Sequence, residues 1–223
     1  MLRRDVEEMR VMADATIELP LSFQVPEEFT DIDFQVSAET NTNRLIERLN
    51  MVDPKPSQEE IAHAVLAQQS MYELLSAAGA VYAGTLLYGP TKDNPEEKLS
   101  SVILTVTARP SELSNDQTVH RLSRALGAIY PDAEVGVVVL AVGPVVLMTE
   151  ERKVEKPVNL LGDGGGPTVV RQLHAFVPIP GRLAMADFAI ATENLADWDS
   201  CVEVLAGVCR TITFPETDSA ATT

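Results

Sequence analysis

The stretch from Val170 to Phe214 constrains the fold most, because its pattern is the most legible in the chain. Two apolar runs flank Pro180-Gly181-Arg182, a tripeptide typical of a tight turn. A segment with apolar residues at helical spacing follows over Ala196–Val208, and a β-branched end closes the stretch. The stretch therefore predicts a β-hairpin, a helix and a short final strand. The helix is expected to bury Trp198, Val202, Leu205 and Cys209.

Two further pairs of apolar runs predict hairpins. In the first pair, Val81–Tyr88 and Ser100–Thr107 are joined by the polar segment Gly89–Lys98. In the second pair, Val135–Val142 and Val145–Met148 are joined by Gly143-Pro144. The second pair is the richer in β-branched residues and is predicted to form the central strands of the sheet. Pro110 is expected to end the strand before it, and Lys153–Thr168 is expected to form a flexible loop.

Helices are predicted between these hairpins. Ser57-Gln58-Glu59-Glu60 has the spacing of a capping box and opens a helix that ends near Gly79. Its core-facing stripe is Ile61, Ala64, Val65, Gln68, Met71, Tyr72 and Leu75. Two more helices are predicted: Asn41–Val52 with Leu45, Leu49 and Val52 on one face, and Asp116–Ile129 with Val119, Leu122, Leu126 and Ile129.

The N-terminal part is less regular. Thr16–Pro26 alternates apolar and polar residues between two prolines, which predicts an edge strand, and Glu27–Phe34 predicts a loop or a second short extended segment. Residues 1–13 are expected to be flexible, 14–214 to form a single domain and 215–223 to form a disordered tail. Because strands come as hairpins, the fold class expected is α+β, a mostly antiparallel central sheet flanked by helices.

The C-terminal hairpin, the Asp197-Trp198 helix start and the ending Cys209–Phe214 resemble the PsbP-like superfamily. This superfamily includes actinobacterial lipoproteins of the LpqN type, and phrases such as Ala80–Gly84 and Ala175–Pro180 are similar to those of uncharacterised actinobacterial proteins. The resemblance covers about Val81–Phe214 and implies an α/β/α sandwich. It carries over no catalytic residues, and the chain lacks the N-terminal lipidated cysteine of the lipoprotein branch.

Composition narrows the classes of partner. The 33 acidic and 17 basic residues give a net charge of -16, which disfavours binding to nucleic acid or anionic membrane surfaces. No run approaches the roughly 20 apolar residues that span a bilayer. Acids follow the arginines of Met1–Met9, so no typical signal peptide is predicted, and a cytoplasmic location is expected. Cys201 and Cys209, about 12 Å apart on one helix, are expected to be reduced thiols.

Few residues suggest chemistry, and the sequence predicts no catalytic, cofactor or metal site. His63, His120 and His174 have no partner at ligand spacing, and His174 is expected to face solvent on its strand. Gly162–Gly166 lacks the Gly-Lys-Ser/Thr ending of a phosphate loop and predicts a mobile linker.

Two patterns that contain acidic residues resemble known functional motifs but lack the spacing or the structural context that those motifs need. The acids Glu27, Glu28, Asp31 and Asp33 do not have the spacing of a calcium loop, so a solvated edge is expected. Tyr130–Glu134 fits an export pattern of type VII secretion substrates, but it precedes a strand, so a chance match is expected.

The sequence thus favours a non-enzymatic protein-interaction module without a cofactor, with an accessory role beside a secretion system as a narrower hypothesis. Two alternatives stay open. One is an enzyme or small-molecule binder whose site assembles from distant residues, such as His174 with Asp187 or Glu134. The other is homo-oligomerisation through an edge strand such as Thr16–Val25.

Overall fold

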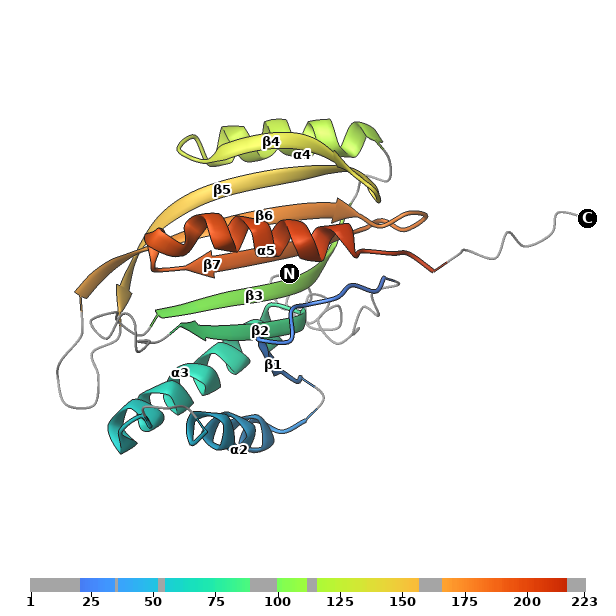
Figure 1. The fold of residues 1–223 in the computed structure, drawn as a ribbon. Coiled ribbons are helices and arrows are strands. Elements are labelled where there is room, and N and C mark those ends of the chain that lie inside the picture. Colours follow the sequence, from blue (N-terminus) through green and yellow to red (C-terminus); the bar gives the residue numbers. More distant parts are fainter. Residues whose placement is uncertain are drawn as a thin grey trace, which may run out of the picture.

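Seven antiparallel strands form the central sheet of the protein. The computed structural model describes residues 21–34, 36–51, 55–88, 100–111, 116–156 and 166–215. The strands are β1 (Thr30–Ile32), β2 (Ala80–Tyr88), β3 (Ser100–Pro110), β4 (Glu134–Leu140), β5 (Gly143–Lys156), β6 (Gly166–Pro178) and β7 (Ala184–Thr192). Their order is β1-β2-β3-β7-β6-β5-β4, and every neighbouring pair is antiparallel (Figure 1). The predicted α+β class is therefore confirmed.

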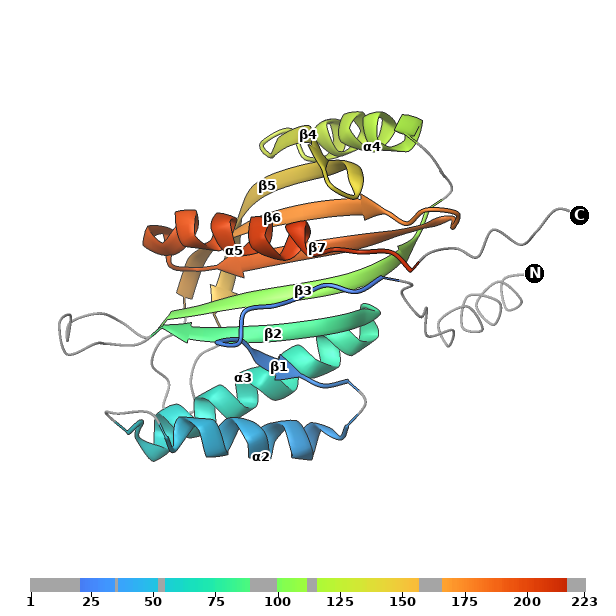
Figure 2. The ribbon, with the colours of Figure 1, turned by 45° about the vertical axis from the view of Figure 1, so that its right-hand side comes forward.

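Helices cover both faces of this sheet. They are α2 (Ala38–Leu49), α3 (Gln58–Ala77), α4 (Asp116–Ile129) and α5 (Trp198–Arg210), which follows a 3-10 turn at Leu195–Asp197. α5 lies over β6 and β7 on one face, whereas α4 lies behind β4 and β5, and the α2–α3 pair lies at the β1–β2 end (Figures 1 and 2). The predicted helices are thus confirmed, with ends shifted by a few residues.

The main core forms between α5 and the sheet face that it covers, here called the α5 face. Strand alternation places Leu104, Phe188 and Ile190 on this face, where they are fully buried. Leu205 and Val208 of α5 pack against them. Each such side chain contributes about 1.5–3 kcal/mol by leaving water, so this layer is a large part of the stability.

The opposite face, here called the α4 face, has a second and smaller core. Val119 of α4 is 1% exposed and packs with Val146, Met148 and Phe176 of the sheet. α4 covers only the β4–β5 end of this face, so polar residues can occupy the strands between α4 and α3.

The described residues before β1, 21–29, do not form the predicted edge strand. Of Thr16–Pro26, the described residues 21–26 lie on the α5 face and make only an isolated bridge, from Ser22 to Thr213. Phe23 packs edge-on against Tyr82 and Phe188, with ring centroids 5.5 and 5.2 Å away. The apolar residues of the alternating segment, Leu21, Phe23 and Val25, do lie on one side, but they pack on the main core and the segment does not extend the sheet edge. The predicted final strand likewise reduces to this bridge.

The central strands were also assigned wrongly. β4 is the outermost strand and not a central one. Its valine-rich sequence is explained by packing on both faces, because Val135 and Val137 pack in the α4-face core and Val138 and Leu140 in the main core. The turn after it is at Ala141–Val142, and Gly143-Pro144 already belongs to β5. A β-branched run shows that a strand is buried on its faces, but not how many neighbours it has.

Of two expected breaks in the sheet, the first is confirmed, because β3 ends at Pro110, and the second is partly strand. Pro110 pairs with Ala184 as the last residue of β3, beyond the end of β2, so its missing N–H interrupts no bond to β2. Lys153–Lys156 pairs with residues 166–169, so the expected loop Lys153–Thr168 is strand at both ends.

Two predicted core positions are exposed: Ile129 is 65% and Val202 is 36% accessible. Further predictions lie outside the described residues, namely those for residues 1–13 and 16–20, Val52, 89–99, 162–165 and 216–223.

Candidate functional site

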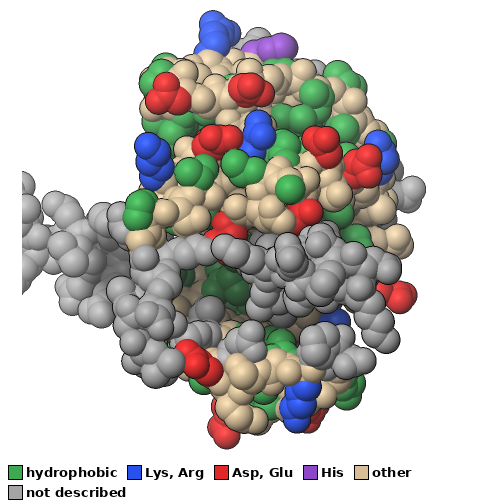
Figure 3. Space-filling model, turned by 60° about the vertical axis from the view of Figure 1, so that its left-hand side comes forward, with side chains coloured by type: hydrophobic (Ala, Val, Ile, Leu, Met, Phe, Trp, Pro, Cys, Tyr) green, Lys and Arg blue, Asp and Glu red, His purple; other side chains and the backbone are tan. Residues whose placement is uncertain are grey.

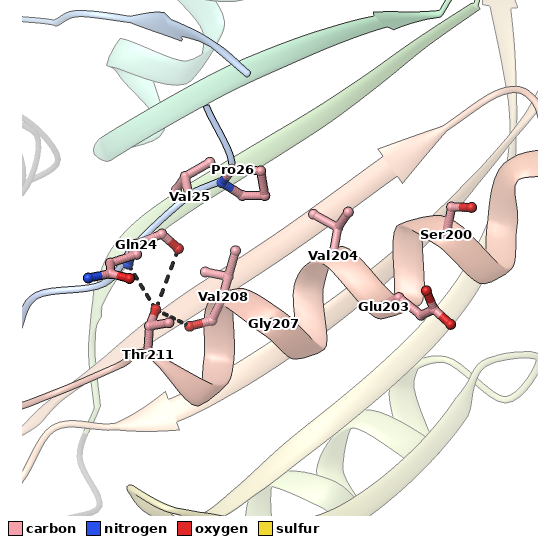
Figure 4. A pocket seen from close by; sticks show the side chains of 9 residues that line it. All are labelled: Gln24, Val25, Pro26, Ser200, Glu203, Val204, Gly207, Val208 and Thr211. Carbon is pink, nitrogen blue, oxygen red and sulfur yellow. Dashed lines mark hydrogen bonds between the residues drawn. The ribbon is translucent and has the colours of Figure 1, made fainter. Parts of the chain in front are cut away.

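A groove of about 490 Å³ runs along α5 on the α5 face, between this helix and residues 24–26. We call it the α5 groove. Its lining residues are Gln24, Val25, Pro26, Ser200, Glu203, Val204, Gly207, Val208 and Thr211. In Figure 4 the side chains of Val204 and Val208 point across the groove toward Val25 and Pro26. Gly207 has no side chain, so the middle of the groove stays open.

Thr211 holds the two walls of the α5 groove together. Its hydroxyl donates to the carbonyl of Val208 at 2.7 Å and accepts from the backbone N–H of Gln24 at 2.8 Å (Figure 4). Beyond it, Ser22 and Thr213 exchange two backbone hydrogen bonds of 2.9 Å. The wall formed by residues 24–26 is thus tied to the end of α5 and is preorganised for binding.

A second groove, of about 480 Å³, lies on the other side of the same wall. We call it the β1 groove; its lining residues are Phe23, Val25, Pro26, Glu27, Phe29, Asp31 and Tyr82. The Tyr82 hydroxyl donates to Asp31 Oδ1 at 2.6 Å. Burial, and then this carboxylate, raise the pKa of Tyr82, so its hydroxyl remains a donor. Val25 and Pro26 line both grooves, which therefore adjoin.

The ionisable side chains that line both grooves are acidic or neutral. Glu203 lines the α5 groove, whereas Glu27 and Asp31 line the β1 groove, and no lysine or arginine is among the described lining residues. Elsewhere the two signs mix: on the face that Figure 3 shows, acidic and basic side chains are interspersed with hydrophobic ones. The α5 groove is therefore mostly apolar with one acid, Glu203, whereas the β1 groove has a mixed lining with two acids.

The acidic cluster that the sequence singled out is split by the structure. Asp31 bonds to Tyr82, and Asp33 lies 3.6 Å from Arg44 in an exposed ion pair. Glu27 and Glu28 are exposed. In the described part of the chain, no group of three or more His, Cys, Asp or Glu residues is placed to hold a metal ion.

The structure brings His174 and Asp187 together on the α4 face. Their Nδ1 and Oδ1 atoms are 3.0 Å apart, since residue 176 pairs with Asp187 and places the carboxylate diagonally across from the imidazole. On its other side, His174 Nε2 is 3.7 Å from Glu150 Oε1. The expectation that His174 faces solvent is wrong: its side chain is 14% exposed and its ring stacks on Phe176.

Two arginines complete this cluster from its edges. Arg152 lies 2.6 Å from Glu150, and Arg109 lies 3.6 Å from Asp187. The hydrogen bond to Glu150, opposed by some desolvation, raises the pKa of Arg152. The two arginines thus flank the carboxylates of Asp187 and Glu150, which lie on either side of His174, and Asp187 orients the imidazole so that Nε2 faces Glu150. His174 therefore lies between two carboxylates, and the cluster is an oriented imidazole–carboxylate pair.

The other sequence candidates are not brought to this cluster. Glu134 starts β4 and is exposed, so it is not the partner of His174; Glu150 takes that place. His120 is exposed on α4, and the side chain of His63 lies outside the described residues. Tyr130–Glu134 is the turn from α4 into β4, where the Arg152 guanidinium lies 6.0 Å from the Tyr130 ring.

Both cysteines are buried on the core side of α5 as free thiols, as predicted. Burial raises the pKa of each to about 11, so neither is a reactive thiolate near neutral pH. Among the helices that the structure describes, none is long and apolar enough to cross a bilayer.

Comparison of the chain with protein-family models, with curated proteins and with solved structures gave no match. The resemblance to the PsbP-like superfamily therefore stays a prediction, and the functional argument rests on the grooves and the cluster themselves. Sequence reasoning missed both grooves. The sequence signal that bears on them is the alternation before Pro26, which predicts an edge strand and not a wall across the face of the sheet.

Proposed function

We propose that this protein is a protein-binding module whose two adjoining grooves receive an apolar segment flanked by lysine or arginine. A place beside a secretion system is the narrower form of the same proposal. The observation that carries it is the apolar floor of the α5 groove, formed by Val25, Pro26, Val204 and Val208, next to the acids of the two grooves, Glu203, Glu27 and Asp31. An apolar side chain that enters such a floor leaves water, and a flanking cation meets the rim.

The shape of the grooves supports a chain segment over a compact metabolite. Each groove is an open trough, and together they extend on both sides of Val25-Pro26. Small-molecule sites are concave and bury most of their ligand. An extended or helical segment needs only one apolar side to be covered, which a trough provides.

The charge of the rim decides the chemistry of the partner. Glu203 and Glu27 are exposed, and the whole chain carries -16. A partner with acidic flanks would be repelled at long range and at contact. Basic flanks accelerate association and set orientation more than they add affinity, so the apolar residues of the segment are expected to supply most of the binding free energy.

A displayed library of random peptides, selected on the full chain, tests this proposal. We expect the selected peptides to share an apolar core with lysine or arginine beside it. In fluorescence anisotropy, Glu203→Lys is expected to weaken a selected peptide by about tenfold, through a reversed rim charge. Glu47→Lys, an equal charge change at an exposed site on α2, is the matched control and is expected to leave affinity unchanged.

The proposal fails if selection enriches no such class, or if the enriched peptides bind the Glu203→Lys and Glu47→Lys variants equally. Rising salt provides a second readout, because it screens the contribution of the rim but not that of the floor.

A second candidate function, binding or proton transfer on a small polar molecule, is favoured by the contact of His174 with Asp187. A thermal-shift panel of sugars, carboxylic acids and nucleotides tests it, with the wild type compared with His174→Gln. A compound that raises the melting temperature of the wild type alone would support this candidate. A panel without such a compound counts against it.

A further inference from the structure

The α4 face has a gap between two helices. α4 lies on β4 and β5, whereas α3 contacts β2 at the other side of the sheet. Among the described helices, none lies squarely over β3, β7 and β6 on this face (Figures 1 and 2). We call the α4 face of these three strands the middle strip.

A row of paired residues that crosses from β2 to β5 shows this gap. At its two ends, Ala83 and Met148 are 0% and 3% exposed, because α3 and α4 lie near them. Thr105, Ala189 and His174 follow one another between these ends and are partly exposed. The two helices therefore seal the sides of the face and leave its middle less well covered.

The gap has the width of one helix. Neighbouring strands lie about 4.8 Å apart, so the four spacings from β2 to β5 span about 19 Å. Packed helices lie about 8–10 Å apart, so one further helix fits between α3 and α4. The floor is uncharged along β7 and β3, where Ala189 and Ala191 lie beside Thr105 and Ile103. The small alanine side chains allow a helix to approach closely.

Residues 1–13 have the sequence of a helix with one apolar side. Leu2, Val6, Met9 and Ala13 follow one another at spacings of four, three and four, which places them on one stripe. Proline and glycine are absent from residues 1–19. An isolated helix of this length is marginal in water, so a segment that is flexible alone folds where its apolar side is covered.

The other longer segments outside the described residues are less suitable. Residues 89–99 and 157–165 contain both proline and glycine, which disfavour a helix. Residues 216–223 contain no apolar side chain larger than alanine. Residues 52–54 and 112–115 are too short to form a helix of the necessary length.

Residues 14–20 are long enough to carry the chain from one face of the sheet to the other. The described chain begins on the α5 face, beside the end of the sheet at which β3 ends (Figures 1 and 2). Packed layers lie about 10 Å apart, so the path from this layer around the sheet to a helix on the α4 face is about 20 Å. Seven extended residues reach up to about 24 Å.

We propose that residues 1–13 form an amphipathic helix that lies in the middle strip, between α3 and α4 of the same chain. This inference is independent of the groove function. The helix completes the second helical layer and covers the contact of His174 with Asp187. Its short connection gives it a local concentration on the order of millimolar at its own sheet, which favours it over a free partner.

A reporter cysteine on the middle strip of the full chain tests the proposal. Ala189→Cys is labelled with maleimide and followed by mass spectrometry, while the buried Cys201 and Cys209 are expected to stay unlabelled. Val6→Asp, on the apolar side of the helix, is expected to speed labelling at least about tenfold, because its carboxylate would have to be desolvated. Val11→Asp makes the same change on the opposite side of the helix and should leave the rate unchanged.

Crosslinking gives a second readout that does not depend on a charge. A short bismaleimide is expected to join Met9→Cys to Ala189→Cys within one chain, and to join Val11→Cys to Ala189→Cys far more slowly. Thr105→Cys, on the neighbouring strand, provides the same labelling test where Ala189→Cys disturbs the sheet.

Three results would overturn the proposal. One is equal labelling of the reporter in the Val6→Asp and Val11→Asp proteins. Another is a reporter that is labelled, with the N-terminal segment unaltered, as fast as Met51→Cys, a site that is 81% exposed. The third is a crosslinked product that has the mass of two chains and not the 24.2 kDa of one.

Discussion

Gly84 on β2 offers a sharp test of the packing that shapes the β1 groove. It pairs with Asp31 of β1, and the side chain of Tyr82 leans over it to reach the Asp31 carboxylate. A Cβ atom at position 84 would lie 2.4 Å from the Tyr82 hydroxyl oxygen, 3.1 Å from its Cζ and 3.3 Å from Phe29 Cδ1. Gly84→Ala must therefore displace the tyrosine ring.

The expected cost follows from three contributions. Overpacking costs about 1–2 kcal/mol, since the ring is held edge-on by Phe23 and cannot move freely. Loss of the hydrogen bond to Asp31 costs about 1 kcal/mol, because that bond is partly solvent-exposed. Alanine has a lower backbone entropy than glycine in the unfolded chain, which offsets these losses by about 0.5 kcal/mol. The free energy of unfolding is thus expected to fall by about 2 kcal/mol.

Urea denaturation of Gly84→Ala measures this change, with an unaltered dependence on denaturant as the sign that the same fold is unfolding. The control is Gly127→Ala on α4, where a Cβ would meet nothing within 4 Å. That substitution is expected to stabilise the protein by about 0.5–1 kcal/mol through helix propensity.

A double-mutant cycle with Tyr82→Phe separates the hydroxyl from the rest of the ring. Without the hydroxyl, the shortest contact and the hydrogen bond are already gone, so Gly84→Ala should cost about 1 kcal/mol less. Two results would refute the reasoning: a Gly84→Ala protein as stable as the wild type, or an equal cost in both backgrounds.

Three further predictions concern the buried polar groups and the core of α5. Burial raises the pKa of Cys201 and Cys209 to about 11 each, so the free energy of unfolding should be at its full value below the usual thiol pKa and should fall as pH rises from there toward 11. Urea denaturation at several pH values checks this. Both thiols should also resist maleimide at neutral pH. Asp187→Asn should lower the free energy of unfolding by about 2 kcal/mol, because the carboxylate accepts from a histidine and faces an arginine while 4% exposed; an unchanged denaturation midpoint would contradict it. Arg171 lies 4.5 Å above the ring of Trp198, the only tryptophan, so Arg171→Gln should change the fluorescence and cost about 0.5–1 kcal/mol.

Local sequence signals predicted the hairpins and helices because each signal acts within the element it describes. The Ser57 spacing opens α3, and Pro180–Arg182 marks the turn between β6 and β7. The place of a strand in the sheet is different, because it depends on contacts far along the chain. β4 and β5 have similar valine-rich sequences, yet only β5 pairs on both sides.

The contact of His174 with Asp187 could have been derived from the predicted turn. A hairpin centred between Gly181 and Arg182 pairs His174 with residue 189 and places Asp187 two residues away on the same face. Glu150 could not be found in this way, because the register of β5 with β6 depends on the length of the connection between them. The contact of His174 with Asp187 could thus be predicted from the sequence, whereas the contact of His174 with Glu150 required the tertiary structure.

The grooves were beyond sequence reasoning for a related reason. Phe23 and Val25 alternate with polar residues as a strand would, and period alone does not say whether a segment joins a sheet or crosses its face. The hydroxyl of Thr211 decides the matter by bonding the backbone of Gln24, 187 positions earlier in the chain.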